Sequence, residues 1–287
     1  MRWTPGQRSD NLEDRRGGGG LGGRGGRGLG LGGVVVLGVL SLVFGRNLFR
    51  DFGVDPTSAL QAPSASAPAD PRARAVQDSV EEPMVRFVSF VLDSTQTYWQ
   101  RQLGPQYPEA KLVLYRGATQ TACGVGQSQS GPFYCPGDQK VYIDLDFFDE
   151  LKSRFGAPGD FAQAYVLAHE IGHHIQNVTG IERQVRQLQQ QRPDMANQLS
   201  VRMELQADCY AGVWGHDAAL QGIIEPGDLE EGLGAAAAVG DDRLQKQTTG
   251  RVQPEAFTHG TSQQRMQWFK RGFDSGDPKA CDAFGGR

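Results

Sequence analysis

The chain has 287 residues, which is enough for one good-sized domain with additional segments. Its 29 basic and 33 acidic side chains give a formal net charge of −4, so the chain as a whole has no general electrostatic attraction to nucleic acid.

The chain begins with a segment rich in glycine and arginine. Residues 17–33 are mostly glycine with interspersed arginine and leucine, and such a composition cannot build a core. We therefore expect residues 1–28 to form a flexible head. An RNA-binding role is disfavoured for this head, because no aromatic side chain between Trp3 and Phe44 could stack on a base.

An uncharged, apolar segment follows at residues 29–44. At about 1.5 Å per residue it would span roughly 24 Å as a helix, less than the roughly 30 Å of a hydrocarbon core. A buried core helix is disfavoured because no amphipathic segments surround it, and a cleaved signal peptide because no small-residue site follows closely. We expect an uncleaved, single-pass signal anchor at residues 29–45 in the inner membrane. The arginines before it predict a cytoplasmic N-terminus and an extracytoplasmic remainder.

Residues 46–79 include a stretch of proline, alanine and serine, which indicates a linker. The folded domain is expected at residues 80–287, a length sufficient for a single core. Periodicity predicts an α+β domain, mainly helical with a small sheet. The predicted helices are 85–103, 147–155, 161–177, 184–191, 193–214, 229–244 and 261–273, and the predicted strands are 111–115 and 141–145.

Three finer expectations concern this domain. Residues 116–131 are rich in glycine and are expected to be irregular. Asp160 can cap the helix that follows it. Gly172 lies inside that helix, where glycine costs about 1 kcal/mol relative to alanine, so a close backbone neighbour is a plausible reason for it.

The helix at 161–177 contains the sequence His-Glu-Ile-Gly-His, which begins at His169. Residues four apart lie on one helix face, so His169 and His173 can hold a single metal ion. Glu170 lies beside that face, where a carboxylate can accept a proton from a metal-coordinated water. The pattern predicts a zinc site together with its general base.

A second pair of acidic residues supports this prediction. Glu204 and Asp208 are again four apart on a predicted helix, among small and apolar residues that indicate burial. Two histidines and one glutamate, with a further position left for water, form the ligand set of a hydrolytic zinc centre. We expect Glu204 to be the third ligand and Asp208 to hydrogen-bond the ring of a ligand histidine, His169 in our interpretation.

Spacing disfavours two other classes of zinc peptidase. A metzincin would have a histidine six residues after His173, where this chain has Thr179. The thermolysin type places its glutamate about twenty residues after the second histidine, whereas Glu204 lies 31 residues beyond His173. A zincin whose glutamate belongs to a Glu-x-x-x-Asp helix fits best.

The remaining histidines have weaker patterns. His174 points about 100° away from its neighbour in the motif and is expected in the core or beside the ligands. His216 is expected to be structural. His259 lies in a loop and is a candidate donor to the oxyanion of a substrate, with an incidental loop histidine as the equal alternative. Asp241 and Asp242 are either partners of the site or exposed acidic residues.

Four cysteines fall in the predicted domain, and an even number outside the cytoplasm indicates disulfides. Three connectivities are possible. We favour Cys123–Cys135, which closes a short loop, and Cys209–Cys281, which ties the C-terminal tail to the helix of Glu204. Zinc binding by cysteine is disfavoured because no two cysteines lie within four residues of each other.

Several motifs in order resemble one bacterial family. The sequences HEIGHHIQ, ELQADCYAGVW, AAAVGDDRLQ and FTHGTSQQR, together with the anchor and the head, are similar to the membrane-anchored neutral zinc metallopeptidases. The resemblance covers about residues 80–273 and implies a zincin-like domain with His169, His173 and Glu204 on zinc and Glu170 as the base. It implies little about the substrate.

These patterns predict a membrane-anchored, extracytoplasmic zinc endopeptidase whose substrate is a peptide or protein. The substrate would lie extended along a sheet edge, with residues 111–115 or 141–145 as the candidate strand. The alternative is a non-catalytic envelope protein that uses zinc for stability and binds partners. The presence of Glu170 argues against that alternative, because stability needs ligands and no base. The sequence makes no prediction of oligomeric state.

Overall fold

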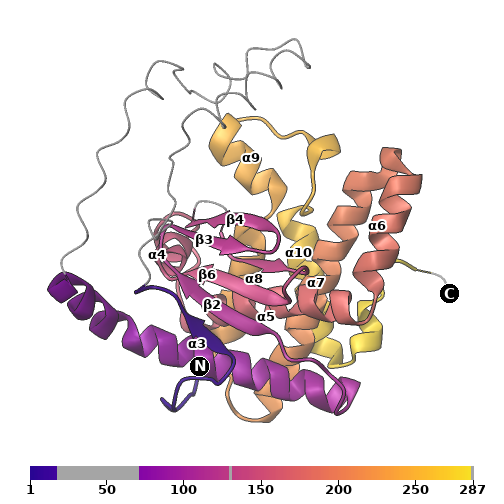
Figure 1. The fold of residues 1–287 in the computed structure, drawn as a ribbon. Coiled ribbons are helices and arrows are strands. Elements are labelled where there is room, and N and C mark those ends of the chain that lie inside the picture. The colour runs from indigo at the N-terminus through magenta and orange to yellow at the C-terminus, as the bar shows by residue number, and fades with distance from the viewer. Residues whose placement is uncertain (18–70, 129–130, 286–287) are drawn as a thin grey trace, which may run out of the picture. The chain divides into compact units, whose positions relative to one another are not determined.

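The computed structural model describes residues 1–17, 71–128 and 131–285. The chain divides into two compact units, Met1–Arg16 with Val80–Arg287, and Gly17–Ser79. The first unit is mainly helical with a small mixed sheet, which confirms the predicted α+β class (Figure 1). Over the described ranges no helix is both long and apolar enough to cross a bilayer, and the predicted anchor at 29–45 lies outside those ranges.

The elements follow the predicted order with some additions. The helices are α3 (Pro71–Leu103), α4 (Asp146–Ser153), α5 (Asp160–Val178), α6 (Ile181–Gln191), α7 (Ala196–Leu220), α8 (Asp228–Ala238), α9 (Asp241–Thr249) and α10 (Ser262–Ser275). The strands are β1 (Leu12–Asp14), β2 (Lys111–Tyr115), β3 (Ala118–Thr121), β4 (Gly124–Gln127), β5 (Phe133–Cys135) and β6 (Lys140–Asp144). Helix α3 begins at residue 71, so it includes the last part of the predicted linker.

The main sheet has the strand order β1-β2-β6-β5. Strands β1, β2 and β6 are parallel, and β5 is antiparallel to β6. The two predicted strands are therefore both interior, and β5 is an edge. The segment 116–131 was expected to be irregular, but it contains the antiparallel pair β3 and β4. Its glycines hide the pattern, because glycine weakens a strand signal and leaves no alternation to detect.

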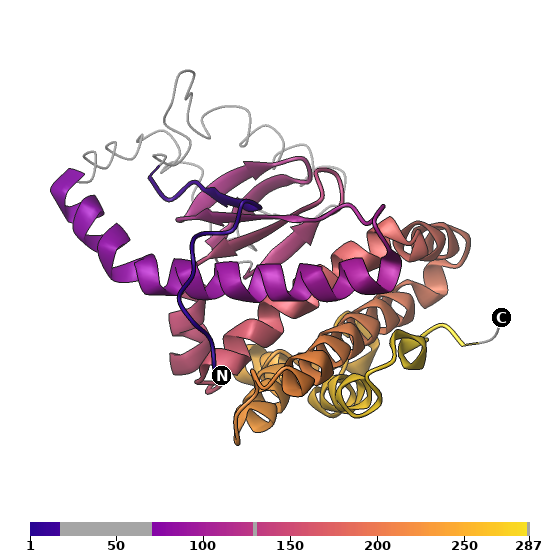
Figure 2. The same cartoon turned by 90° about the horizontal axis from the view of Figure 1, so that it is seen from below.

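Helix α5 lies between the sheet and the helices α7 and α8, and contacts β5 and β6 on one side and α7 and α8 on the other. In Figure 2 α3 runs along the sheet, and one cluster of buried side chains joins α3, the sheet and α5. Gly172 of α5 is where α7 comes closest, since a Cβ atom built there would lie 3.0 Å from the Cα and carbonyl oxygen of Ala207. The predicted reason for this glycine is confirmed.

Two local predictions were wrong. The cap of α5 is not Asp160: the backbone N–H of Phe161 donates to the carboxylate of Glu231 at 3.1 Å, while Asp160 pairs with the α-ammonium group of Met1 at 3.0 Å. The predicted helix at 229–244 is two helices, broken between Ala238 and Asp241. A tertiary contact explains the break, because Gly240 packs so closely on Ser262 that a Cβ atom would lie 2.3 Å from its backbone nitrogen.

The first sixteen residues belong to the folded unit, whereas we expected them in a flexible head. Strand β1 pairs with β2, and the buried guanidinium of Arg16 binds Asp14 and Glu81 at 2.7 and 2.6 Å. The glycine-rich composition of residues 17–33 does not extend to this polar segment. Strand β1 has three residues, which are too few to show periodicity, and its position is fixed by backbone pairing with β2. The sequence pattern therefore did not reveal this strand.

Candidate metal centre

Three side chains converge between helices α5 and α7. The Nε2 atom of His169 lies 3.2 Å from Oε2 of Glu204, and the Nε2 atom of His173 lies 3.4 Å from Oε1 of the same carboxylate. One ligand atom from each residue lies within 4.8 Å of the others, so the three form a cluster that could hold a metal ion. The helical spacing of the two histidines therefore places them as the motif predicts.

The second nitrogen of each of these two histidines has an acceptor. Nδ1 of His169 lies 2.8 Å from Oδ1 of Asp208, and Nδ1 of His173 lies 2.9 Å from Oε1 of Gln176. A carboxylate and an amide oxygen only accept, so Nδ1 carries a proton in both rings, and Nε2 is the nitrogen that faces Glu204 and would bind a metal. Gln176 is itself fixed, because its amide nitrogen donates to the carbonyl of Met203 at 2.8 Å. Both rings are thus oriented for a metal.

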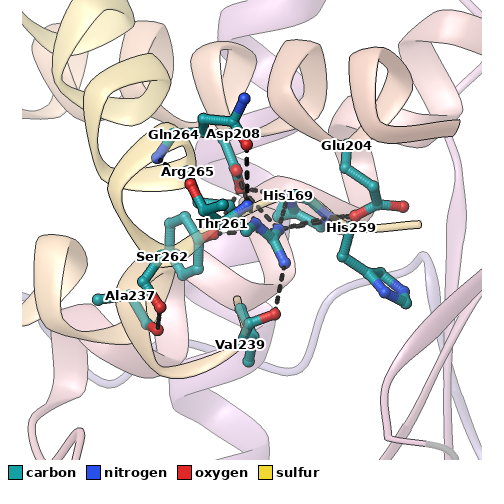
Figure 3. Close-up of polar contacts among 12 residues, drawn as sticks. His169, Glu204, Asp208, Ala237, Val239, His259, Thr261, Ser262, Gln264 and Arg265 are labelled. Carbon is teal, nitrogen blue, oxygen red and sulfur yellow. Dashed lines mark hydrogen bonds and ion pairs between the residues drawn. The ribbon is translucent and has the colours of Figure 1, made fainter. Parts of the chain in front are cut away.

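Asp208 is the centre of a buried polar group that the sequence only partly indicated (Figure 3). It accepts hydrogen bonds from His169 and from the guanidinium of Arg265. It also accepts one from the hydroxyl of Tyr165. Tyr165, Gln176 and Arg265 were not predicted as site residues. Arg265 comes from the motif FTHGTSQQR, more than fifty residues further along the chain, and only the packing of α10 on α7 brings it here.

Charge at the cluster favours a cation. Burial alone lowers the pKa of the histidines, because it disfavours an imidazolium. The carboxylate of Glu204 outweighs this effect and raises the pKa of His173 to about 9, and Asp208 likewise raises the pKa of His169. Burial raises the pKa of Glu204, but the two histidines hold it well below its usual range. With its donor set of two imidazoles and one carboxylate, the cluster fits zinc.

Glu170 and the ligands border a cleft of about 860 Å³. The side chain of Glu170 is 7% exposed, so it is shielded and still reaches the cleft. Phe133 and Tyr134 of the edge strand β5 line the same cleft. The cleft is therefore bordered by Glu170, by the cluster of two histidines and Glu204, and by the edge strand β5.

His259 also lines this cleft, and Figure 3 shows it next to Glu204. Its loop is held by Asp241, which accepts the backbone N–H groups of Thr258, His259 and Gly260 and lies 3.1 Å from Nδ1 of His259. The hydrogen bond to Asp241 raises the pKa of His259. The side chain is half exposed and can act as a hydrogen-bond donor toward the cleft.

The other two histidines have structural contacts, as expected. His174 is fully buried, lies between Tyr134 and the carbonyl of Pro108, and has its pKa lowered to about 4 by burial. His216 binds the carbonyl oxygen of Phe273 at 2.7 Å.

All four cysteines are paired in the favoured connectivity, Cys123–Cys135 and Cys209–Cys281. Both predicted disulfides are therefore confirmed. They indicate an oxidising, extracytoplasmic environment.

Two histidines and one glutamate on neighbouring helices, with a further glutamate beside them in a cleft, are the arrangement found in zinc-dependent hydrolases. A family model described as "Putative neutral zinc metallopeptidase" matches residues 1–284, and the chain belongs to this family.

Curated relatives are similar over long stretches. The uncharacterized protein YpfJ of Escherichia coli strain K12 is 52% identical over 293 aligned residues, which cover 99% of each chain. The uncharacterized proteins Rv2575 of Mycobacterium tuberculosis strain H37Rv and Mb2605 of Mycobacterium bovis are each 46% identical over 203 residues, or 67% of this chain and 68% of theirs. No solved structure matches the chain.

Proposed function

We propose that the protein is a zinc-dependent endopeptidase with a zincin-like catalytic domain. His169, His173 and Glu204 would hold the metal, and Glu170 would be the general base. Zinc, when bound, supplies Lewis acidity that lowers the pKa of a coordinated water to about 7. The observation that carries the proposal is the convergence of three correctly oriented ligand atoms beside Glu170 in an open cleft.

Each side chain has a distinct part in peptide hydrolysis. Glu170 accepts the proton of the attacking water and returns it to the leaving amine. Asp208 and Gln176 hold the two imidazoles in the tautomer that presents Nε2. His259, whose pKa is raised by its hydrogen bond to Asp241, would donate to the oxyanion that forms at the scissile carbonyl.

A peptide substrate would lie extended along β5. We expected β2 or β6 in this role, but each of these strands is hydrogen-bonded on both sides and offers no edge. Strand β5 is the edge that borders the cleft, and a peptide added there would pair with its free backbone groups. Phe133 and Tyr134 would then contact the substrate beside the metal.

We propose an extracytoplasmic location and membrane attachment through residues 29–45. The predicted single crossing with a cytoplasmic head conflicts with the fold, because β1 precedes this segment, β2 follows it, and the two strands pair in one sheet. We therefore propose that both flanks of the segment lie on the same side of the membrane. Labelling of cysteines introduced into the full chain, one at Gly6 and one at an exposed residue of α9, tests this topology. A membrane-impermeant reagent added outside the cell should label both positions equally. Protection of the cysteine at position 6 alone would support the single crossing.

Metal analysis tests the catalytic proposal. The purified full chain should contain about one zinc per molecule, and His169→Ala or Glu204→Ala should lose most of it. Full retention of zinc in both variants would remove the basis of the proposal.

The alternative function, a zinc-stabilised envelope protein without activity, is disfavoured because Glu170 borders an open cleft and lies outside the cluster of His169, His173 and Glu204. Comparison of cleaved envelope proteins in cells with the wild-type chain and with Glu170→Gln distinguishes the two functions. Protein fragments that disappear in the variant support a peptidase, and identical fragment patterns support the alternative.

A further inference from the structure

Arg265 is a buried arginine at the metal cluster. It lies on the first turn of α10 and is 3% exposed. Its Nε and Nη2 atoms each donate to a different oxygen of Asp208, both at 2.8 Å, and its Nη1 atom donates to the carbonyl of Val239 at 3.4 Å (Figure 3). Two parallel hydrogen bonds between planar groups fix the orientation of the carboxylate as well as its position.

This orientation matters because Asp208 holds His169 through one oxygen. The oxygen Oδ1 accepts from Nδ1 of His169, from the hydroxyl of Tyr165 and from Arg265. The side chain of Asp208 is fully buried, so its oxygens depend on donors from the protein. An unpaired buried carboxylate would be strongly destabilised and would rotate or take up a proton. Arg265 prevents both changes.

A positively charged guanidinium next to a cation site is electrostatically unfavourable, so its presence here needs an explanation. Its Nη2 atom lies 3.3 Å from Nδ1 of His169 and 3.6 Å from Oε2 of Glu204. A guanidinium this close repels a metal ion, so by charge alone its removal would tighten metal binding. If it acts by holding Asp208, its removal would weaken metal binding. The two effects have opposite signs, which makes the role of the residue measurable.

The start of α10 is built to keep Arg265 in place. Thr261 caps the helix and forms a reciprocal pair of hydrogen bonds with Gln264. The carboxylate of Asp242 accepts the backbone N–H and the hydroxyl of Ser262, at 2.7 and 2.9 Å. The helix that carries the arginine is thus attached to α9 immediately before the first turn.

We propose that Arg265 is a positioning residue of the metal centre, which fixes Asp208 and through it the imidazole of His169. This inference rests on the proposed zinc site. It assigns to the FTHGTSQQR motif a function at the metal, in addition to the possible donor His259.

Zinc affinity of the full chain, measured by competition with a chromophoric chelator, tests the proposal. Loss of an outer hydrogen-bonding partner typically weakens metal binding by about 10- to 100-fold. We expect this weakening for Arg265→Gln and for Asp208→Asn, and a smaller one for Arg265→Lys, which keeps the charge without the paired geometry. Arg271→Gln is the matched control, because Arg271 is exposed on the same helix and lies over Trp268.

The double variant decides how Arg265 acts. If the arginine works through Asp208, then Asp208→Asn with Arg265→Gln should bind zinc about as weakly as Asp208→Asn alone. If Arg265→Gln alone fails to fold, the double variant, in which both buried charges are removed, is compared with the wild type as well as with Asp208→Asn. Independent, multiplicative losses in the double variant, or unchanged or tighter binding by Arg265→Gln, would overturn the inference. A wild-type chain that binds no zinc would instead refute the proposed function.

Discussion

The disulfide Cys209–Cys281 connects the C-terminal tail to the metal centre through a chain of hydrogen bonds. The carbonyl of Cys281 accepts from the amide of Gln206 at 2.9 Å, the side-chain oxygen of Gln206 accepts from Gln176 at 3.2 Å, and Gln176 accepts from His173. All the linking side chains are buried. Release of the tail should therefore disturb a zinc ligand as well as the stability of the domain.

The size of the stability effect follows from the loop that each disulfide closes. Cys209 and Cys281 are 72 residues apart, and closing such a loop lowers the entropy of the unfolded chain by an amount worth about 4 kcal/mol. Cys123 and Cys135 are 12 residues apart, for which the same relation gives about 3 kcal/mol. The two disulfides thus stabilise the folded chain by amounts that differ by about 1 kcal/mol. Only Cys209–Cys281 is linked by the hydrogen bonds above to a proposed metal ligand.

Paired replacement of each disulfide by alanine separates these effects. The Cys209→Ala, Cys281→Ala variant should lose about 4 kcal/mol in urea unfolding and bind zinc about 10-fold more weakly in chelator competition. The Cys123→Ala, Cys135→Ala variant should lose about 3 kcal/mol and keep the wild-type zinc affinity. Equal zinc affinities in the two variants would show that the hydrogen-bond chain from Cys281 to His173 has no effect on the ligand.

Three further predictions concern other parts of the domain. Gly172→Val should destabilise the chain by about 1–3 kcal/mol in urea unfolding, because its side chain would overlap the backbone of Ala207; an unchanged midpoint would contradict the close helix packing. His259→Gln should lower kcat by about 100-fold with zinc retained, and an unaltered kcat would exclude it as an oxyanion donor. The hydrogen bond from Arg16 lowers the pKa of Asp14 from 3.8 to about 2, so Asp14 stabilises the folded chain above pH 4 and loses this effect as the pH falls to 2. The stability difference between wild type and Asp14→Asn should therefore shrink over that range, and a constant difference would refute the role of Asp14 in holding β1.

The parts of the site that lie on single helices were predictable from the sequence. Residues four apart share a helix face, so each pair could be placed on one face of its helix without knowledge of the fold. The two pairs are His169 with His173 and Glu204 with Asp208. The contact between α5 and α7 was also predictable from the sequence, because a glycine inside a helix, here Gly172, indicates a close neighbour.

The residues that were missed act only through tertiary contacts. Gln176 and Arg265 belong to types that are common on solvated helix faces, and nothing adjacent to them in the chain shows that they are buried against the ligands. Tertiary contacts also explain two other failed predictions. Glu231 replaces Asp160 as the cap of α5, and the contact of Gly240 with Ser262 ends the helix before Asp241. In each case a residue from a distant segment outweighs the local sequence preference.

Strand β1 illustrates a different limit. Compositional analysis assigned residues 1–28 to one flexible head, although the composition changes at residue 17. A three-residue strand carries almost no periodic signal, and its pairing with β2 spans about a hundred residues of chain. The pairing also bears on the membrane topology, because paired strands lie on the same side of a membrane, and it is the basis of our proposal that both flanks of residues 29–45 do so.

The central claim is that Glu170 acts as the base of a zinc peptidase. The most direct test is the turnover of a cleaved peptide by the zinc-loaded full chain and by Glu170→Gln, with metal content determined on the same samples. Glutamine keeps the size and hydrogen bonding of the side chain but cannot accept the proton. We predict about one zinc per chain in both proteins and a fall in turnover of about 100-fold or more in the variant. Equal turnover by two proteins with equal zinc content would contradict the account.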